Sequence, residues 1–122
     1  MAKIAIIEDD SAISQMYRIK FEAEGYSVET AENGVLGLKL AEAIKPDIIL
    51  LDLMMPEMNG HEMLKKLRET SWGKNIKVVI LTNMGEQEAP EGLRDLGVSA
   101  FILKADMTPR QVAEIVKTQL GK

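Results

Sequence analysis

The chain has 122 residues, of which 46% are hydrophobic, and a formal net charge of −4 from 15 basic and 19 acidic side chains. This length predicts one domain from residue 1 to residue 122, which can bury roughly two-thirds of the surface of the unfolded chain. The composition excludes disulfides and thiolate metal sites because there is no cysteine. No apolar run approaches the roughly 20 residues of a membrane span. There is also no stripe of basic residues that would favour direct nucleic-acid binding.

Short apolar runs alternate with helical periodicity along the chain. In chain order we predict a strand at 3–7, a helix at 11–24, a strand at 26–30, a helix at 34–44, a strand at 47–51, a helix at 60–69, a strand at 77–81, a helix at 90–96, a strand at 100–103 and a helix at 108–120. Five strands alternating with five helices predict an α/β fold, in which a parallel sheet carries helices on both faces.

Four of the predicted strands end in polar side chains that can do chemistry. These are Glu8 and Asp9 after the first strand, Asp52 after the third, Thr82 after the fourth and Lys104 after the fifth. The carboxyl ends of parallel strands meet at one edge of the sheet, where open α/β sheets bind ligands. Three carboxylates at one place repel one another, which a divalent cation relieves, and hard oxygen ligands favour Mg²⁺. The sequence therefore predicts a cation site at this edge.

The ordered set of strand-end residues resembles the receiver domains of two-component response regulators, and among them the single-domain regulators of the chemotaxis kind. The matching residues are Glu8-Asp9, Asp52 within Leu-Asp-Leu-Met-Met-Pro-Glu-Met-Asn-Gly, Thr82 after Val-Ile-Leu, and Lys104 at the end of Phe-Ile-Leu-Lys. The resemblance covers essentially the whole chain. It implies a flavodoxin-like, doubly wound, five-stranded parallel sheet with strand order 2-1-3-4-5 and five helices.

The resemblance also implies the chemistry of the site. Asp52 would be the nucleophile that takes a phosphoryl group, as an aspartyl-phosphate, from a histidine kinase or a phosphotransfer protein. Asp9 and Asp52 would ligate Mg²⁺ directly, with Mn²⁺ as an alternative ion. Glu8 would act largely through water, and the backbone carbonyl of Met54 would be a further ligand.

A second implication of the resemblance is how the signal leaves. Lys104 and the Thr82 hydroxyl would neutralise charge on the phosphoryl oxygens. Thr82 would then move toward the phosphoryl group and Phe101 would change rotamer, which shifts the population between two packings. The moving face would be the fourth helix, the fifth strand and the fifth helix, and it would contact an unidentified downstream protein. We therefore expect a cytoplasmic signalling switch that neither binds a membrane nor acts as a metabolic enzyme.

Three features depart from the usual pattern of this family. Ala105 stands where a proline usually follows the strand-end lysine. Because a cis bond before a non-proline residue costs about 3–4 kcal/mol, we expect a trans peptide there, the alternative being a strained cis bond held by Asp106 and the cap at Thr108. Pro90 falls inside the expected fourth helix, which should therefore begin late or be short. On the second helix, Leu36 and Leu40 lie next to the stripe of residues that is expected to face the core. They are either scattered surface leucines or part of a contact surface.

Two other interpretations remain open at this point. An aspartate nucleophile, Mg²⁺, a threonine and a lysine also serve haloacid-dehalogenase-like phosphatases, but such an enzyme needs a second aspartate where this chain has Met54. The chain is also consistent with a receiver cut from a larger transcription factor or sensor kinase. Asp10, the third acidic residue of its run, is expected to begin the first helix and not to join the site.

Overall fold

The computed structural model describes residues 2–121 as a single five-stranded sheet with helices on both faces. In chain order the strands and α-helices are β1 (Lys3–Ile7), α1 (Ser11–Ala23), β2 (Ser27–Ala31), α2 (Gly34–Ile44), β3 (Ile48–Leu51), α3 (Gly60–Glu69), β4 (Lys77–Thr82), β5 (Val98–Leu103) and α4 (Pro109–Gln119). Every strand pair is parallel and the strand order is β2-β1-β3-β4-β5, which confirms the expected topology.

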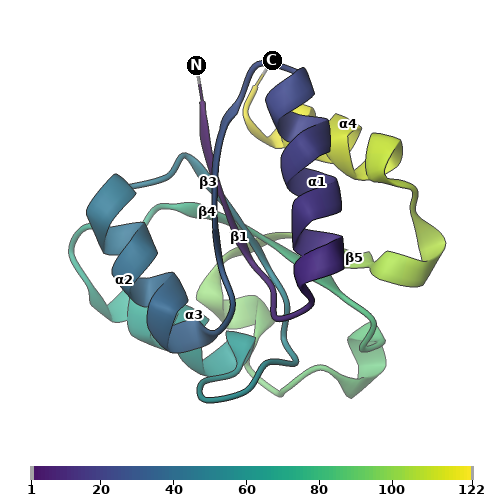
Figure 1. Ribbon diagram of the computed structural model, residues 1–122. Helices are drawn as coiled ribbons and strands as arrows, with labels where there is room; N and C mark the ends of the chain where they lie inside the picture. Colours follow the sequence, from purple (N-terminus) through teal and green to yellow (C-terminus); the bar gives the residue numbers. More distant parts are fainter. Residues whose placement is uncertain (1, 122) are drawn as a thin grey trace.

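The sheet separates two apolar layers. Figure 1 shows α1 and α4 on one side of the sheet and α2 and α3 on the other. Alternate strand residues supply each layer: Ile4, Ile6 and Leu50 pack with α1 and α4, whereas Ile7 and Ile49 pack with α2 and α3. The central strands are therefore buried on both faces, which explains why they are continuous apolar runs and do not alternate with polar residues.

The prediction of five helices is wrong, because the described residues form four α-helices. The segment expected to be the fourth helix, 90–96, contains only one short 3₁₀ turn, η2 (Arg94–Leu96), and another such turn, η1 (Glu86–Glu88), precedes it. Pro90 has no N–H to donate to a helix, and Gly92 adopts a φ of 85°, in the left-handed region that an α-helix does not use. The predicted last helix, at 108–120, is thus α4.

The guanidinium of Arg68, near the end of α3, holds the segment before β5 in place. Its Nε donates to the carbonyl of Leu96 at 2.7 Å and its Nη2 to that of Gly97 at 3.1 Å. Its Nη1 donates to the carbonyls of Gly73 and Ile76, each at 2.8 Å. One side chain therefore joins α3, the turn before β4 and the turn before β5. Its partners are backbone oxygens, and burial lowers the pKa of Arg68.

Helix caps settle the role of Asp10. Its side chain accepts hydrogen bonds from the backbone N–H groups of Ala12 and Ile13, so it is the N-cap of α1, as expected. Thr108 caps α4 through a reciprocal pair with Gln111. No helix within residues 2–121 is long and apolar enough to cross a membrane.

Candidate functional site

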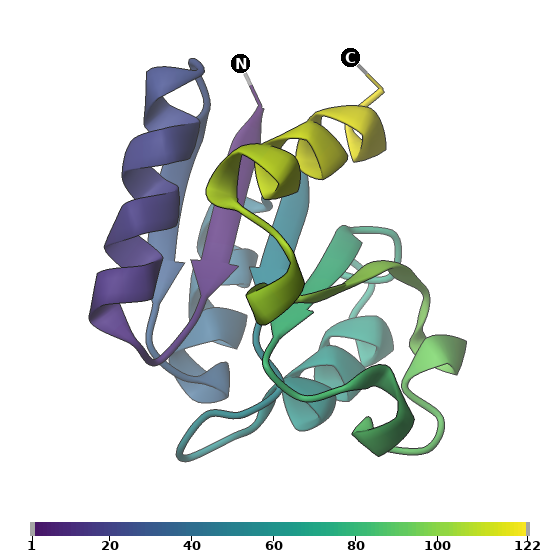
Figure 2. The same cartoon turned by 90° about the vertical axis from the view of Figure 1, so that its right-hand side faces the viewer.

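The strands bring the predicted residues to one edge of the sheet. Figure 2 shows the arrowheads of β1, β3 and β4 pointing to the same lower edge. Glu8 and Asp52 directly follow β1 and β3, and their backbone N–H groups extend the ladder by donating to the carbonyls of Ala31 at 2.9 Å and Ile7 at 3.0 Å. The register of neighbouring parallel strands thus places these two side chains side by side, although 44 positions separate them in the sequence.

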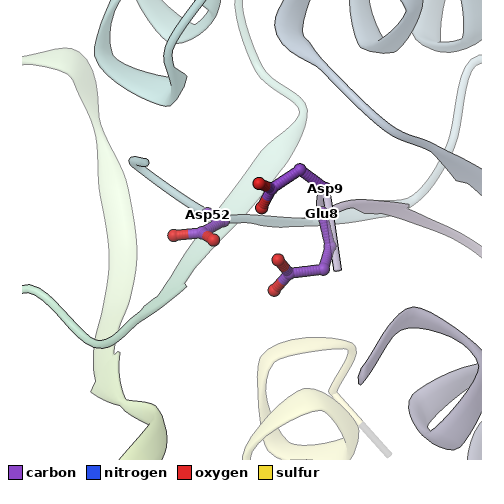
Figure 3. Close-up of side chains that lie close together, drawn as sticks. All are labelled: Glu8, Asp9 and Asp52. Atoms are coloured by element: carbon purple, nitrogen blue, oxygen red, sulfur yellow. The ribbon is translucent and has the colours of Figure 1, made fainter. Parts of the chain in front are cut away.

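Three carboxylates converge at this edge. Figure 3 shows the side chains of Glu8, Asp9 and Asp52 turned toward one another, and one oxygen of each lies within 4.8 Å of the others. Glu8 and Asp52 are only 5% and 6% exposed, whereas Asp9 is exposed to solvent. Carboxylate oxygens at this spacing fit a hydrated Mg²⁺ ion, which takes hard oxygen ligands and keeps several waters.

Lys104 is the cation of the site. It belongs to a third short 3₁₀ turn, η3 (Lys104–Asp106), and its Nζ donates to Oδ2 of Asp52 at 3.2 Å and to Oε1 of Glu8. Three ionised carboxylates and one ammonium leave two negative charges, the number that a divalent cation neutralises. The peptide bond from Lys104 to Ala105 is trans, as expected, since the structure contains no cis peptide bond within residues 2–121.

Burial changes the proton affinities of the paired groups. Removal of Glu8 from water raises its pKa to about 7, although the hydrogen bond from Lys104 lowers it and the negative charge of Asp52 raises it further. For Lys104, burial favours the neutral amine, but the hydrogen bond to Glu8 and the charge of Asp52 outweigh burial and raise its pKa. Lys104 is therefore charged near neutral pH, while burial favours the neutral form of Glu8.

Thr82 and Phe101 lie at or near the same edge but outside the contacts of the acidic cluster. Thr82 is the last residue of β4 and is fully buried, and its hydroxyl accepts a hydrogen bond from the N–H of Met84 at 3.2 Å. Phe101 lies in β5 opposite Ile80 and is partly buried in the layer that also contains α2 and α3. Their predicted roles in switching require movement, so they remain predictions.

Met54 contributes a backbone group to the site. Its N–H donates to Oδ1 of Asp52 at 3.2 Å, so both oxygens of this carboxylate have a donor. The residue itself is 58% exposed. The part that its carbonyl would play as a metal ligand stays a prediction.

Two glycines, Gly60 and Gly34, shape the loop after Asp52. A Cβ at Gly60 would lie 2.2 Å from the carbonyl oxygen of Asp52, so only glycine allows α3 to start against this backbone. The N–H of Gly34, at the start of α2, donates to the carbonyl of Met58 at 3.0 Å, and a Cβ there would lie 2.5 Å from the same oxygen. The Asn59-Gly60 pair before the third helix was the available signal for the first of these contacts.

Comparisons with known proteins agree with this geometry. The family model of the response regulator receiver domain matches residues 4–117. The polar-differentiation response regulator DivK of Brucella anthropi is 33% identical over 118 residues, which cover 97% of this chain and 95% of DivK. The DNA-binding transcriptional regulator RpaA of Synechocystis is 38% identical over 105 residues, but they are 85% of this chain and only 43% of RpaA.

A solved structure shows the same architecture. The chemotaxis response regulator CheY4 of Vibrio cholerae is 29% identical and superposes with a TM-score of 0.87, covering 97% of this chain and 98% of CheY4. The family match, the strand order and the carboxylates at the strand ends therefore agree. This chain belongs to the response regulator receiver domains, the phospho-accepting switches of two-component signalling.

Proposed function

We propose that residues 1–122 form one receiver domain in which Asp52 accepts the phosphoryl group. The observation that carries this assignment is the placement of its carboxylate, which is nearly buried between the ammonium of Lys104 and the two acidic residues after β1. A carboxylate oxygen of Asp52 attacks the phosphorus of a phosphohistidine on the donor protein. A P–O bond forms, and the bond from phosphorus to the imidazole nitrogen of that histidine breaks. The leaving imidazole takes the electron pair and a proton, which leaves an aspartyl-phosphate.

The site's own residues chiefly position the group and neutralise its charge, since phosphoryl transfer needs little other covalent chemistry from the protein. Lys104 already contacts Asp52 and carries the positive charge that would meet one phosphoryl oxygen. The Thr82 hydroxyl, at the end of the neighbouring strand, would meet another. The N–H of Met54 holds Oδ1 of Asp52 and limits rotation of the nucleophile.

Mg²⁺ is the proposed cofactor, with Mn²⁺ as an alternative ion. Glu8, Asp9, Asp52 and the carbonyl of Met54 would hold it, because the three carboxylates already lie within 4.8 Å of one another. When bound, the ion supplies positive charge to the equatorial oxygens of the phosphoryl group.

The output surface is proposed to be the face formed by residues 83–97, β5 and α4, with Thr82 and Phe101 as the switch. This face differs from the expected one because the segment before β5 is irregular. A cavity of about 320 Å³ lies there, and Phe101, Leu93 and Ala89 are among its lining residues. A rotamer change of Phe101 would alter this cavity directly.

The partners that we propose are a histidine kinase or phosphotransfer protein as donor and a downstream protein as receiver of the signal, in the cytoplasm. We propose no metabolic activity. A phosphatase of the haloacid-dehalogenase kind would need an acid where Met54 stands, and Met54 presents a thioether instead.

Labelling with acetyl phosphate and Mg²⁺ tests the assignment. Asp52→Asn should abolish the phosphoryl adduct seen by intact mass spectrometry, since it removes the nucleophile and keeps the shape. Asp10→Asn is the matched control, because asparagine caps a helix as well as aspartate does and this variant should be labelled normally. An adduct of unchanged yield on the Asp52→Asn protein would refute the proposal.

A further inference from the structure

The segment that stands in place of a fourth helix is joined to the rest of the fold by few backbone hydrogen bonds. In the part of the chain that the structure describes, the backbone hydrogen bonds of residues 84–95 join groups no more than three positions apart. They include those from the N–H groups of Met84, Glu88, Leu93 and Asp95 to the Thr82 hydroxyl and to the carbonyls of Gly85, Pro90 and Gly92. Movement of this segment away from the sheet therefore breaks no bond of a β-ladder or of an α-helix.

One side chain anchors the segment in the core. Leu93 is 2% exposed and packs in the layer of α2 and α3, whereas Glu88 and Glu91 are exposed. The cavity of about 320 Å³ that Leu93 lines together with Phe101 of β5 lies beside it, so the segment covers a hollow and not a filled core. Because burial of apolar side chains is the main favourable term in folding, a segment with one buried anchor next to a hollow belongs to the least stable part of the fold.

Both ends of the segment are fixed. Thr82 is fully buried at the end of β4, immediately before the segment. At the other end, the carbonyls of Leu96 and Gly97 accept hydrogen bonds from Arg68 at 2.7 and 3.1 Å. Gly92, between these ends, has a φ of 85°, and glycine is the residue whose backbone changes conformation at the lowest steric cost. Movement is therefore limited to residues 84–95, which lie at the lower right of Figure 2, in green and outside the sheet.

We propose that residues 84–95 form a flap that opens as one unit while the sheet stays intact, with the Leu93 side chain as the contact that holds it closed. Opening withdraws Leu93 from the layer of α2 and α3 and uncovers the ring of Phe101, which lines the same cavity. A partner that contacts Phe101 at the output surface therefore meets this ring in the open form. That role rests on the proposed function, whereas the opening itself requires neither phosphorylation of Asp52 nor Mg²⁺.

Thiol labelling with an aromatic disulfide reagent measures the opening, because the chain has no cysteine and each variant then carries a single thiol. In Leu93→Cys the thiol is reached when the flap opens. Leu64→Cys is the matched control, since Leu64 is fully buried on α3 in the same layer and is reached only when the whole protein unfolds. In chelator and without urea, Leu93→Cys should be labelled at least about a hundredfold faster than Leu64→Cys. Low concentrations of urea should speed labelling of Leu64→Cys steeply and that of Leu93→Cys only slightly, because opening the flap exposes little surface.

Amide exchange tests the same opening with Leu93 in place. The hydrogen-bonded amides of Glu88, Leu93 and Asp95 should exchange with one common opening constant that depends weakly on urea. Val28→Ala, which leaves a cavity in the layer of α1 and α4, should speed exchange in the strands about tenfold and leave these three amides unchanged.

Three results would overturn the proposal. Equal labelling rates of Leu93→Cys and Leu64→Cys with the same urea dependence, or strand and flap amides that respond alike to Val28→Ala, would show that residues 84–95 unfold only with the whole protein. Labelling of Leu93→Cys as fast as that of a thiol in the urea-unfolded protein would show that no closed flap exists. These measurements use the resting protein without a phosphoryl donor, so failure of Asp52 to be phosphorylated would refute the proposed function and leave the flap standing.

Discussion

The raised pKa of Glu8 predicts a measurable cost of ionising this group in the folded protein. Burial raises the pKa from 4.5 to about 7, and at roughly 1.4 kcal/mol per pKa unit this corresponds to about 3 kcal/mol. Below pH 4.5 Glu8 is neutral in both states. Between pH 4.5 and 7 the unfolded chain loses the proton that the folded chain keeps, so the free energy of unfolding falls as the pH rises through this window.

Replacing Glu8 with glutamine removes this titration and keeps an oxygen that accepts from Lys104. We therefore expect Glu8→Gln to gain stability relative to the unmodified protein as the pH rises from 4.5 to 7, by up to about 3 kcal/mol. Other titrating groups are common to both proteins and largely cancel in the difference. Lys104 does not interfere, because its raised pKa places its loss of charge well above this window.

Urea unfolding of both proteins in chelator, at pH values from 4.5 to 8, measures the difference. A difference in the free energy of unfolding that stays constant with pH would refute the assignment of a buried, proton-holding Glu8. In the unmodified protein at pH 8, Mg²⁺ should restore stability, because it binds the ionised cluster only in the folded state. Glu8→Gln should gain less from the same Mg²⁺ concentration.

Three further changes probe the loops around the site. Gly60→Ala should destabilise the protein by about 1–3 kcal/mol in thermal unfolding, since the added Cβ would lie 2.2 Å from a backbone oxygen. In the control Gly85→Ala the nearest neighbour of the added Cβ would be 3.5 Å away, so an equal loss of stability there would argue against this contact. Arg68→Lys should lower the free energy of unfolding by about 1.5–3 kcal/mol and speed amide exchange across 94–97, because an ammonium cannot make the same forked set of hydrogen bonds to the carbonyls. Unchanged exchange there would show that Arg68 does not hold this segment in place. Met54→Asn should shorten the lifetime of the aspartyl-phosphate, measured by mass spectrometry, because an amide can orient the attacking water where a thioether cannot; a longer lifetime would contradict this.

The apolar runs and their order along the chain were enough to predict the sheet. Ile48 to Leu51 is a continuous apolar run because β3 is covered on both faces, and that pattern is visible without coordinates. Parallel strands bring their carboxyl ends to one edge, so Glu8, Asp9, Asp52 and Lys104 could be assigned to one site from their positions after strands. The cap at Asp10 followed in the same way from local chemistry.

Other features depended on contacts between residues far apart in the sequence. The fourth helix was expected from a short periodic stretch, but Pro90 and the left-handed Gly92 prevent it, and Arg68, far along the chain, holds the segment through backbone oxygens. The pKa of Glu8 depends on burial and on Lys104, which lies 96 positions away. Periodicity and spacing report local preference and strand order, whereas burial, steric exclusion at Gly60 and the cavity beside Phe101 exist only once the elements have packed.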